Sequence, residues 1–483
     1  MSRPWMRGMR GAWVAVALLA AGCASVPRDA GLSGVQKTVE EQSGQRLDWS
    51  PAQSIEPPTD ERLRALLEGE LTAERAVEIA LTNNRDLLAA LEELGVARAD
   101  LIAARTVRNP IFDGEMRFDG NPGNPFEIAV MQTLIDLFRL RKRRALGQAE
   151  FVAAQLRVTG AVLGFTAEVK ADYYTLQAAQ QALAQQRTIT AAAEASAELS
   201  RRQHDAGNIS DLDLELEQSI YEGAKLDLAR AELDEIRSRE RLLAALGALE
   251  TLPLTLPPQA LPAEGGQERS LERSLEEVEA ALPRRLDLSL AQAKVEAARR
   301  ALPLAGTSTY DELAAGVHYE REPDGKKTAG PAVAIPIPIF DRGLAGRARA
   351  AAGLRVAEQR LHALTVNARS EARTALESLL EAKARADYLG TVVVPRRQRI
   401  LNLTQLEYNA MLRGVFDLIR ARQGLSDALR EQVMAIRDYW LARTELDAAV
   451  SGVLGFSARP ERPELRRMDL FEPSPQQESK ENE

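Results

Sequence analysis

Side chains that carry catalysis or bind metals are scarce in this chain. Among its 483 residues there are three histidines and one cysteine. His204 lies beside a predicted turn and next to Asp205, yet no serine or cysteine nucleophile is placed with it. His318 falls on the polar face of a predicted strand and His362 on a predicted helix. The sequence therefore predicts neither a catalytic site nor a metal site, and no cofactor is expected.

The single cysteine, Cys23, stands where a lipid could be attached. Three arginines in the first ten residues precede an apolar run, residues 12–21, that is too short to span a bilayer. The run leads into Leu-Ala-Ala-Gly-Cys, which resembles a bacterial lipoprotein signal and implies cleavage before Cys23 and lipidation of its thiol. Ala24 replaces the aspartate of an inner-membrane retention signal, which favours the outer membrane. A plain signal peptide with an incidental cysteine is the alternative.

The charge balance argues against nucleic acid as a partner. The formal net charge is −8 at pH 7, and no basic stripe with interleaved aromatic residues is present. Hydrophobic residues make up 45% of the chain, but aromatic residues make up only 5%. Alanine therefore supplies much of the apolar surface, as in helices that pack with their backbones close together.

The elements that would position functional side chains are very long helices. Residues 126–252 contain no proline and are rich in Ala, Leu, Glu, Gln and Arg, which favour helices. Gly207 and Asn208 interrupt this run where a left-handed C-cap can form, and Ser210 can cap the next helix. The first of the two antiparallel helices would be about 100 Å long. Helices of that length bury their apolar stripes in a coiled coil, a bundle or a helical barrel.

Two β-hairpins interrupt the helical pattern. Residues 111–119 and 126–131 alternate between an apolar face and a more polar one, with a turn-rich loop between them. A second hairpin is predicted over residues 310–320 and 330–339. The apolar face could meet a protein core or lipid, whereas the charged face requires water. Four strands are too few to close a barrel, so hairpins in a membrane would require several copies of the chain.

The order of elements occurs twice, which indicates an internal duplication. Three landmarks repeat about 200 residues later: Asp86 aligns with Asp287, Val130 with Val333 and Asp213 with Asp417. Pro395 lies inside the second long helix and predicts a kink there. We divide the chain into a signal peptide (1–22), an extended leader (23–70), a first repeat (71–250), a connector (251–270), a second repeat (271–456) and a disordered tail (457–483).

One helical stripe has heptad-like spacing. It consists of Leu226, Ala229, Leu233, Ile236 and Leu243. On this stripe alone, an ordinary soluble coiled coil is an alternative to a hollow helical tube. The two hairpins favour the tube.

Together these features resemble the TolC-type outer membrane factors. The resemblance covers roughly residues 71–456 and rests on the lipoprotein signal, the opening Leu71-Thr72…Ala76…Ala80-Leu81…Asn84…Asp86-Leu87, the two hairpins and the two turns. It implies a mainly α protein with a small β part. Three chains would form a helical barrel and a 12-stranded transmembrane β-barrel, four strands from each chain. The implied partners of this homotrimer are a periplasmic adaptor, an inner-membrane efflux pump and outer membrane lipid.

The resemblance also implies which residues carry function. In the family, the two turns lie at the periplasmic end, where hydrogen bonds and ion pairs close the duct. The matching residues are Asp213, Tyr408, Arg413 and Asp417, whose donors and acceptors can tie adjacent helices together. A solvated helix surface is the alternative for each charge. Contact with the adaptor is expected at turn residues that otherwise only shape the chain, namely Gly207, Asn208, Ile209, Leu412 and Gly414.

The resemblance leaves the substrate open. Met411 stands where the family usually has glycine, and the segment 408–418 is most similar to members associated with heavy-metal export. The expected function is the exit duct of a tripartite efflux system in the outer membrane of a Gram-negative bacterium. The alternatives are the duct of a type I protein secretion system and a soluble periplasmic coiled-coil protein.

Overall fold

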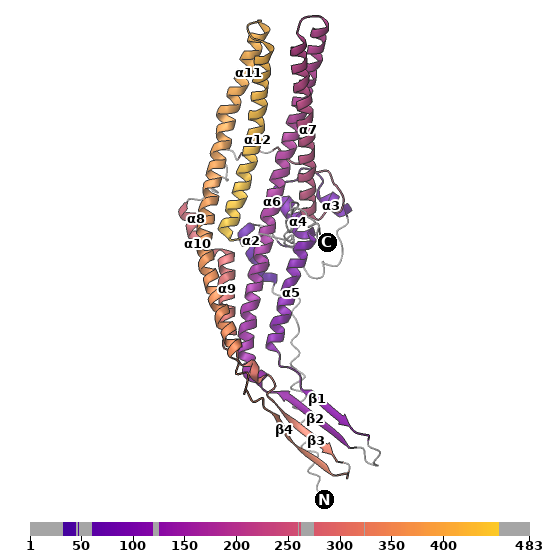
Figure 1. Ribbon diagram of the computed structural model, residues 1–483, viewed down its shortest axis with the longest axis vertical. Helices are drawn as coiled ribbons and strands as arrows, with labels where there is room; N and C mark the ends of the chain where they lie inside the picture. The colour runs from indigo at the N-terminus through magenta and orange to yellow at the C-terminus, as the bar shows by residue number, and fades with distance from the viewer. Residues whose placement is uncertain are drawn as a thin grey trace, which may run out of the picture.

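The computed structural model is elongated, with a small sheet at one end and two tight helical turns at the other (Figure 1). It describes residues 32–44, 47, 60–118, 125–258, 260–261, 275–322 and 324–453. Two pairs of long helices run along the molecule, and shorter helices pack near its middle (Figure 1). The predicted signal peptide, Cys23 and the predicted tail lie outside the described residues.

Capping side chains set the helix starts in the first half of the chain. The Thr72 side chain accepts a hydrogen bond from the backbone of Arg75, and the Asn84 side chain accepts one from Leu87. Because Asn84 starts a new helix, the helical segment between Thr72 and Thr106 consists of two helices. The elements are α4 (Ala73–Asn83), α5 (Arg85–Arg105), β1 (Ile111–Met116), β2 (Phe126–Thr133), α6 (Ile135–Asp205) and α7 (Asp211–Leu246).

The second half repeats this order with more interruptions. Pro395 lacks a backbone N–H and its ring crowds the preceding turn, and the irregularity expected there takes the form of a π-helical turn, η4, just before it. The elements are α8 (Leu275–Ala281), η2 (Leu282–Arg284), α9 (Leu286–Ala301), η3 (Ser308–Tyr310), β3 (Ala314–Arg321), β4 (Lys327–Ala334), α10 (Leu344–Tyr388), η4 (Leu389–Val393), α11 (Val394–Asn409) and α12 (Val415–Ser451).

The four strands form one antiparallel sheet in the order β1-β2-β3-β4. Its central pairing joins the two repeats, since β2 belongs to the first and β3 to the second. The register places Phe112, Val130 and Val317 side by side on one face, and all three are exposed. The opposite face carries Glu127 and His318, whose Nε2 lies 2.9 Å from Glu127 Oε1. The sheet is therefore apolar on one face and polar on the other.

The main core lies where α4 and α5 pack on α6 and α7. Leu91, Val162 and Leu242 are fully buried there. The hydroxyl of buried Tyr173 donates to the carbonyl of Leu71 at 2.8 Å. Each fully buried leucine side chain stabilises the fold by about 1.5–3 kcal/mol. This core fixes the long helices near their middle. Toward the turn end, beyond the core, α6 packs mainly on α7 and α11 mainly on α12.

Two sequence expectations are wrong in detail. The leader is not extended throughout, because α2 (Leu32–Ser43) and α3 (Asp60–Leu66) lie within it. Val35 and Val39 are four residues apart on one face of α2 and pack into the core. The second strand of the second hairpin is also displaced from its predicted range of 330–339: β4 ends at Ala334 because the prolines that follow cannot donate ladder hydrogen bonds.

Candidate functional site: the helical turns and their supports

The first turn, between α6 and α7, is closed by backbone and side-chain hydrogen bonds. Gly207 has φ +71°, the left-handed region that glycine adopts without a steric penalty. The amide of Asn208 donates to the carbonyl of Gln203 at 2.8 Å, which completes a helix C-cap. Ser210 and Asp213 then form a capping box, in which the backbone of each donates to the side chain of the other at 3.2 Å. The first turn is therefore capped on both sides.

The second turn, between α11 and α12, has the same backbone path, but its residues are less suited to that path. Met411 occupies the position of Gly207 and has φ +59°, the one positive φ of a non-glycine residue in the described part of the chain. The amide of Leu412 donates to the carbonyl of Glu407 at 2.9 Å. Gly414 stands where Ser210 caps α7, and it has no side chain to cap α12. The second turn is thus strained on one side and uncapped on the other.

The polar residues predicted to form the gate bind within their own turns. Asp213 Oδ2 accepts from the Ser210 hydroxyl at 2.7 Å. Arg413 Nε donates to Glu407 Oε2 at 2.9 Å, and its Nη1 lies 3.9 Å from Asp417 Oδ2. Tyr408 is half-buried on α11. Between the two turns of this protomer, the described residues form no hydrogen bond or ion pair, so their role toward neighbouring helices stays a prediction.

A histidine stabilises the first turn in a way that the sequence did not reveal. His204 Nε2 lies 2.6 Å from Asp211 Oδ1 across the turn, and its Nδ1 lies 3.9 Å from Asp205 Oδ1. The hydrogen bond with Asp211, together with both nearby carboxylates, raises the pKa of His204. Its counterpart in the second turn is Tyr408. The sequence signal for this contact is a histidine seven residues before an aspartate, with a Gly-Asn turn between them.

Apolar side chains lie exposed at the turn end of the molecule. Met411 is 93% exposed, and Leu412 and Leu212 are also exposed. Gly207 and Asn208 lie at the same end, with no atom near the place of a Gly207 side chain. An exposed patch with backbone accessible beside it is suited to contact with another protein. The predicted adaptor-contact residues therefore sit at the end farthest from the sheet (Figure 1).

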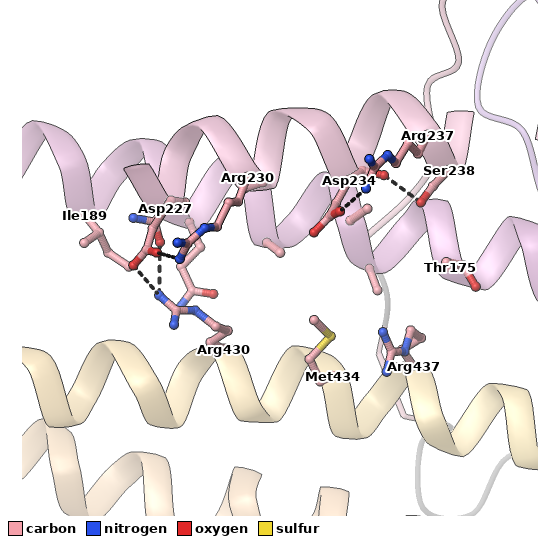
Figure 2. A pocket seen from close by; sticks show the side chains of 16 residues that line it. Thr175, Ile189, Asp227, Arg230, Asp234, Arg237, Ser238, Arg430, Met434 and Arg437 are labelled. Atoms are coloured by element: carbon pink, nitrogen blue, oxygen red, sulfur yellow. Dashed lines mark hydrogen bonds and ion pairs between the residues drawn. The ribbon is translucent and has the colours of Figure 1, made fainter. Parts of the chain in front are cut away.

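A pocket of about 500 Å³ lies between the two helix pairs, lined by α6, α7 and α12 (Figure 2). Arg430 on α12 reaches across it: its Nη2 lies 3.7 Å from Asp227 Oδ2 on α7 and donates to Gln186 Oε1 on α6 at 3.3 Å. Arg230 donates to the same Asp227 at 3.1 Å. These contacts tie the second helix pair to the first below the turns, and no sequence pattern pointed to them.

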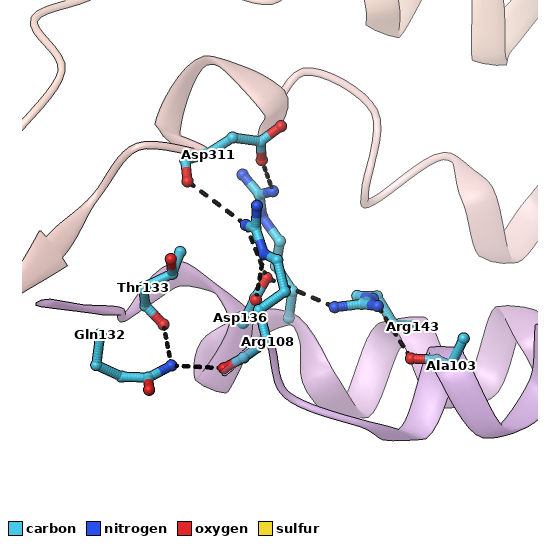
Figure 3. A network of polar contacts seen from close by, with 8 residues as sticks. Ala103, Arg108, Gln132, Thr133, Asp136, Arg143 and Asp311 are labelled. Atoms are coloured by element: carbon cyan, nitrogen blue, oxygen red, sulfur yellow. Dashed lines mark hydrogen bonds and ion pairs between the residues drawn. The ribbon is translucent and has the colours of Figure 1, made fainter. Parts of the chain in front are cut away.

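A polar network joins the sheet to the helices at the other end (Figure 3). Asp136, in the first turn of α6, is buried and accepts from Arg108 Nε at 2.7 Å, and Arg143 Nη1 lies 3.5 Å from it. The Arg108 guanidinium, mainly through this hydrogen bond, holds the pKa of Asp136 below its usual value. Arg139 pairs with Asp311 in the second repeat. The network joins the start of α6 to the segments that lead into β1 and β3.

Neither metal chemistry nor a helical membrane span is supported by the described residues. Within the ranges given above, no group of three or more His, Cys, Asp or Glu residues could hold a metal ion. In the same ranges no helix combines the length and apolar composition needed to cross a bilayer.

Comparison with known proteins gives a consistent family. Residues 76–248 match the family model described as outer membrane efflux protein. The cobalt-zinc-cadmium resistance protein CzcC of Cupriavidus metallidurans is 25% identical over 396 residues, which cover 78% of this chain and 90% of that protein.

Solved structures share the fold at low identity. The CmeC outer membrane channel of Campylobacter jejuni has a TM-score of 0.68 at 16% identity, covering 90% of this chain and 93% of that chain. The outer membrane protein VceC of Vibrio cholerae has a TM-score of 0.65 at 16% identity, covering 80% and 96%. The duplicated hairpins and long helix pairs, together with these similarities, show that the chain has the TolC-type fold and is similar to outer membrane efflux proteins.

Proposed function

We propose that this chain is the outer membrane duct of a tripartite efflux system. The observation that carries the proposal is the similarity to CzcC, which extends over 78% of the chain and includes both repeats. The family model and the channel structures agree with efflux rather than with a type I secretion duct or a soluble coiled-coil protein. The chain acts by conducting substrate, and its family consists of channels rather than enzymes.

A homotrimer follows from the surfaces that one chain leaves uncovered. β1 and β4 are the edges of a sheet of four strands, and an edge in lipid must pair with another strand. Along α7 the predicted stripe is only partly covered: Leu243 is buried in the protomer, whereas Leu226, Leu233 and Ile236 are exposed. The exposed part is available for a neighbouring protomer, and three copies would close a barrel of twelve strands.

The proposed partners meet the two ends of this trimer. The turn end would contact a periplasmic adaptor and, through it, an inner-membrane pump; Asp213, Tyr408, Arg413 and Asp417 would then control its opening. Lipid attachment at Cys23 would fix the other end to the outer membrane. If so, labelled palmitate is incorporated into the wild-type protein in a Gram-negative host and not into the Cys23→Ser variant.

We further propose that the substrate is a divalent transition-metal cation, as the name of the CzcC relative suggests. The polar face of the sheet supports passage of cations. Glu115, Glu127 and Glu320 are directly opposite one another on three adjacent strands, so that the interior of a closed barrel would carry rings of carboxylates.

Deletion of the gene, in a host that carries the cognate pump and adaptor, tests the proposal. Cells without the duct should retain more zinc, cobalt or cadmium after loading, measured by mass spectrometry of the washed cells. Complementation with the gene should restore export. Unchanged metal content with increased retention of a drug would refute the metal substrate and leave the efflux duct.

A further inference from the structure

Basic residues gather where the sheet meets the helices, although the whole chain is acidic. Directly after β2, residues 139–144 contain five cations in the second and third turns of α6. After β4 and the segment that follows it, Arg342 and Arg347 flank the start of α10, whose first turn contains no acid. These cations occur in a chain whose net charge is −8.

Part of this charge is neutralised inside the protein, and part is not. Arg139 and Arg143 belong to the network with Asp136 and Asp311 (Figure 3). The other five cations are exposed and form no ion pair with the described residues: Arg141, Lys142, Arg144, Arg342 and Arg347. Arg144 Nη2 donates to the carbonyl of Arg105 at 3.4 Å, and Arg347 lies one turn into α10, whereas Arg141, Lys142 and Arg342 are closest to the sheet. We call these three residues the basic collar. The acid beside Arg342, Asp341, accepts a hydrogen bond from the Gly343 amide at 2.8 Å.

An exposed apolar segment borders the basic collar on the side of the sheet. Val333 lies on the apolar face of β4, and the next residues of the same period-two series, Ile335, Ile337 and Ile339, are all exposed. Phe340, the residue after Ile339, is 99% exposed. Exposed apolar side chains therefore continue past the end of β4 and stop two residues before Arg342.

The same order, apolar and then basic, occurs on α6. Phe138 is 74% exposed and lies three and four residues before Arg141 and Lys142, on the same helix face. The rise from Phe138 to Lys142 is about 6 Å. The headgroup layer on one side of a bilayer is about 5–8 Å thick. An aromatic ring at the hydrocarbon boundary would thus place both cations at the depth of the lipid phosphates.

We infer that the basic collar binds the phosphate groups of anionic phospholipids in the leaflet around the helix-side end of the barrel. The inference rests on the proposed outer membrane location. The apolar segment selects a lipid rather than a soluble anion, because its exposed side chains follow directly after β4, whose apolar face would meet lipid in the proposed barrel. The contact would fix the depth of the duct in the membrane.

Native mass spectrometry of the purified trimer, with phosphatidylglycerol and phosphatidylcholine added in equal amounts, tests the inference. The wild-type protein should retain phosphatidylglycerol in preference. The triple variant Arg141→Gln, Lys142→Gln and Arg342→Gln should reduce that preference about tenfold, since each cation near an anionic surface contributes severalfold. A matched variant with three exposed arginines of the second helix pair replaced, Arg360→Gln, Arg396→Gln and Arg399→Gln, should keep the preference.

Equal lipid preference in the triple variant and the wild-type protein would overturn the inference. Loss of the bound lipid on addition of inorganic phosphate alone would also overturn it, because the site would then recognise a free anion. Single-channel conductance in a planar bilayer reports the proposed function separately. A conducting wild-type channel without headgroup preference refutes the basic collar alone, whereas a chain that forms no channel refutes the duct itself.

Discussion

Replacing Met411 by glycine should stabilise the second turn. Met411 has φ +59°, and its counterpart in the first turn, Gly207, has φ +71°. Both turns have the same backbone hydrogen bonds, so the two positions differ mainly in the presence of a Cβ atom. The Met411 side chain is 93% exposed and therefore loses little packing when it is removed.

The size of the effect follows from backbone sterics. The left-handed conformation costs a residue with a Cβ atom about 1–2 kcal/mol, and the greater freedom of glycine in the unfolded chain offsets part of this gain. A net stabilisation of about 1 kcal/mol is expected, which is about fivefold in the opening equilibrium of the turn. The reverse change, Gly207→Ala, should destabilise the first turn by a similar amount, since no atom lies within 4 Å of the added Cβ.

Hydrogen exchange at the two turns measures this prediction. The reporter amides are those of Leu412 and Asn208, which donate across the second and the first turn. Met411→Gly should slow exchange at Leu412 about fivefold, and Gly207→Ala should speed exchange at Asn208 about fivefold. Gly223→Ala is the control, because Gly223 is helical with open space beside it, and that change should leave both turns unaffected. Faster exchange at Leu412 in Met411→Gly would refute the argument from backbone strain.

Three further predictions concern the polar residues. Because Asp211 raises the pKa of His204, the first turn should be most stable below the ordinary histidine pKa of about 6.5. It should lose that stability as the pH rises through the raised pKa. Hydrogen exchange measured against pH checks this, and His204→Gln should remove the pH dependence. Arg430→Ala should cost about 0.5–1 kcal/mol in a denaturant titration by breaking a half-exposed link between the helix pairs. Tyr408→Phe combined with Arg413→Ser should raise single-channel conductance in an intact trimer; unchanged conductance would mean that these side chains are only a solvated surface.

The sequence was informative about long helices and strands because their patterns are local. A proline-free run and a change of period from 3.6 to 2 depend on neighbouring residues alone. The break at Asn84 has no local signal, because Asn in a helical pattern is tolerated and its role as a cap depends on the chain turning there. The burial of α2 was missed because a short amphipathic helix in a polar, proline-containing segment depends on the core that it meets.

For the candidate site, the sequence predicted positions better than partners. The two turns lie at the positions that the sequence duplication predicted. However, Asp213 accepts a hydrogen bond from Ser210, and Arg413 donates one to Glu407, so both bind within their own turns. Such contacts depend on side-chain conformations in an exposed turn, where several acceptors compete. The link from Arg430 to Asp227 joins helices about two hundred residues apart in sequence, and a single sequence gives no signal for such a pair.

The two repeats differ in how firmly their helix pairs and turns are held, and this difference bears on opening of the duct. The first helix pair has an uninterrupted 71-residue helix, a glycine at the left-handed position and a capping box. The second pair has a π-helical turn before Pro395, Met411 at the left-handed position and no side-chain cap at Gly414. Each difference lowers the free energy needed to bend or open the second pair. We therefore expect α11 and α12 to move when the duct opens, while α6 and α7 stay fixed. A spin-label pair across α11 and α12 should then show a broader distance distribution than the equivalent pair across α6 and α7.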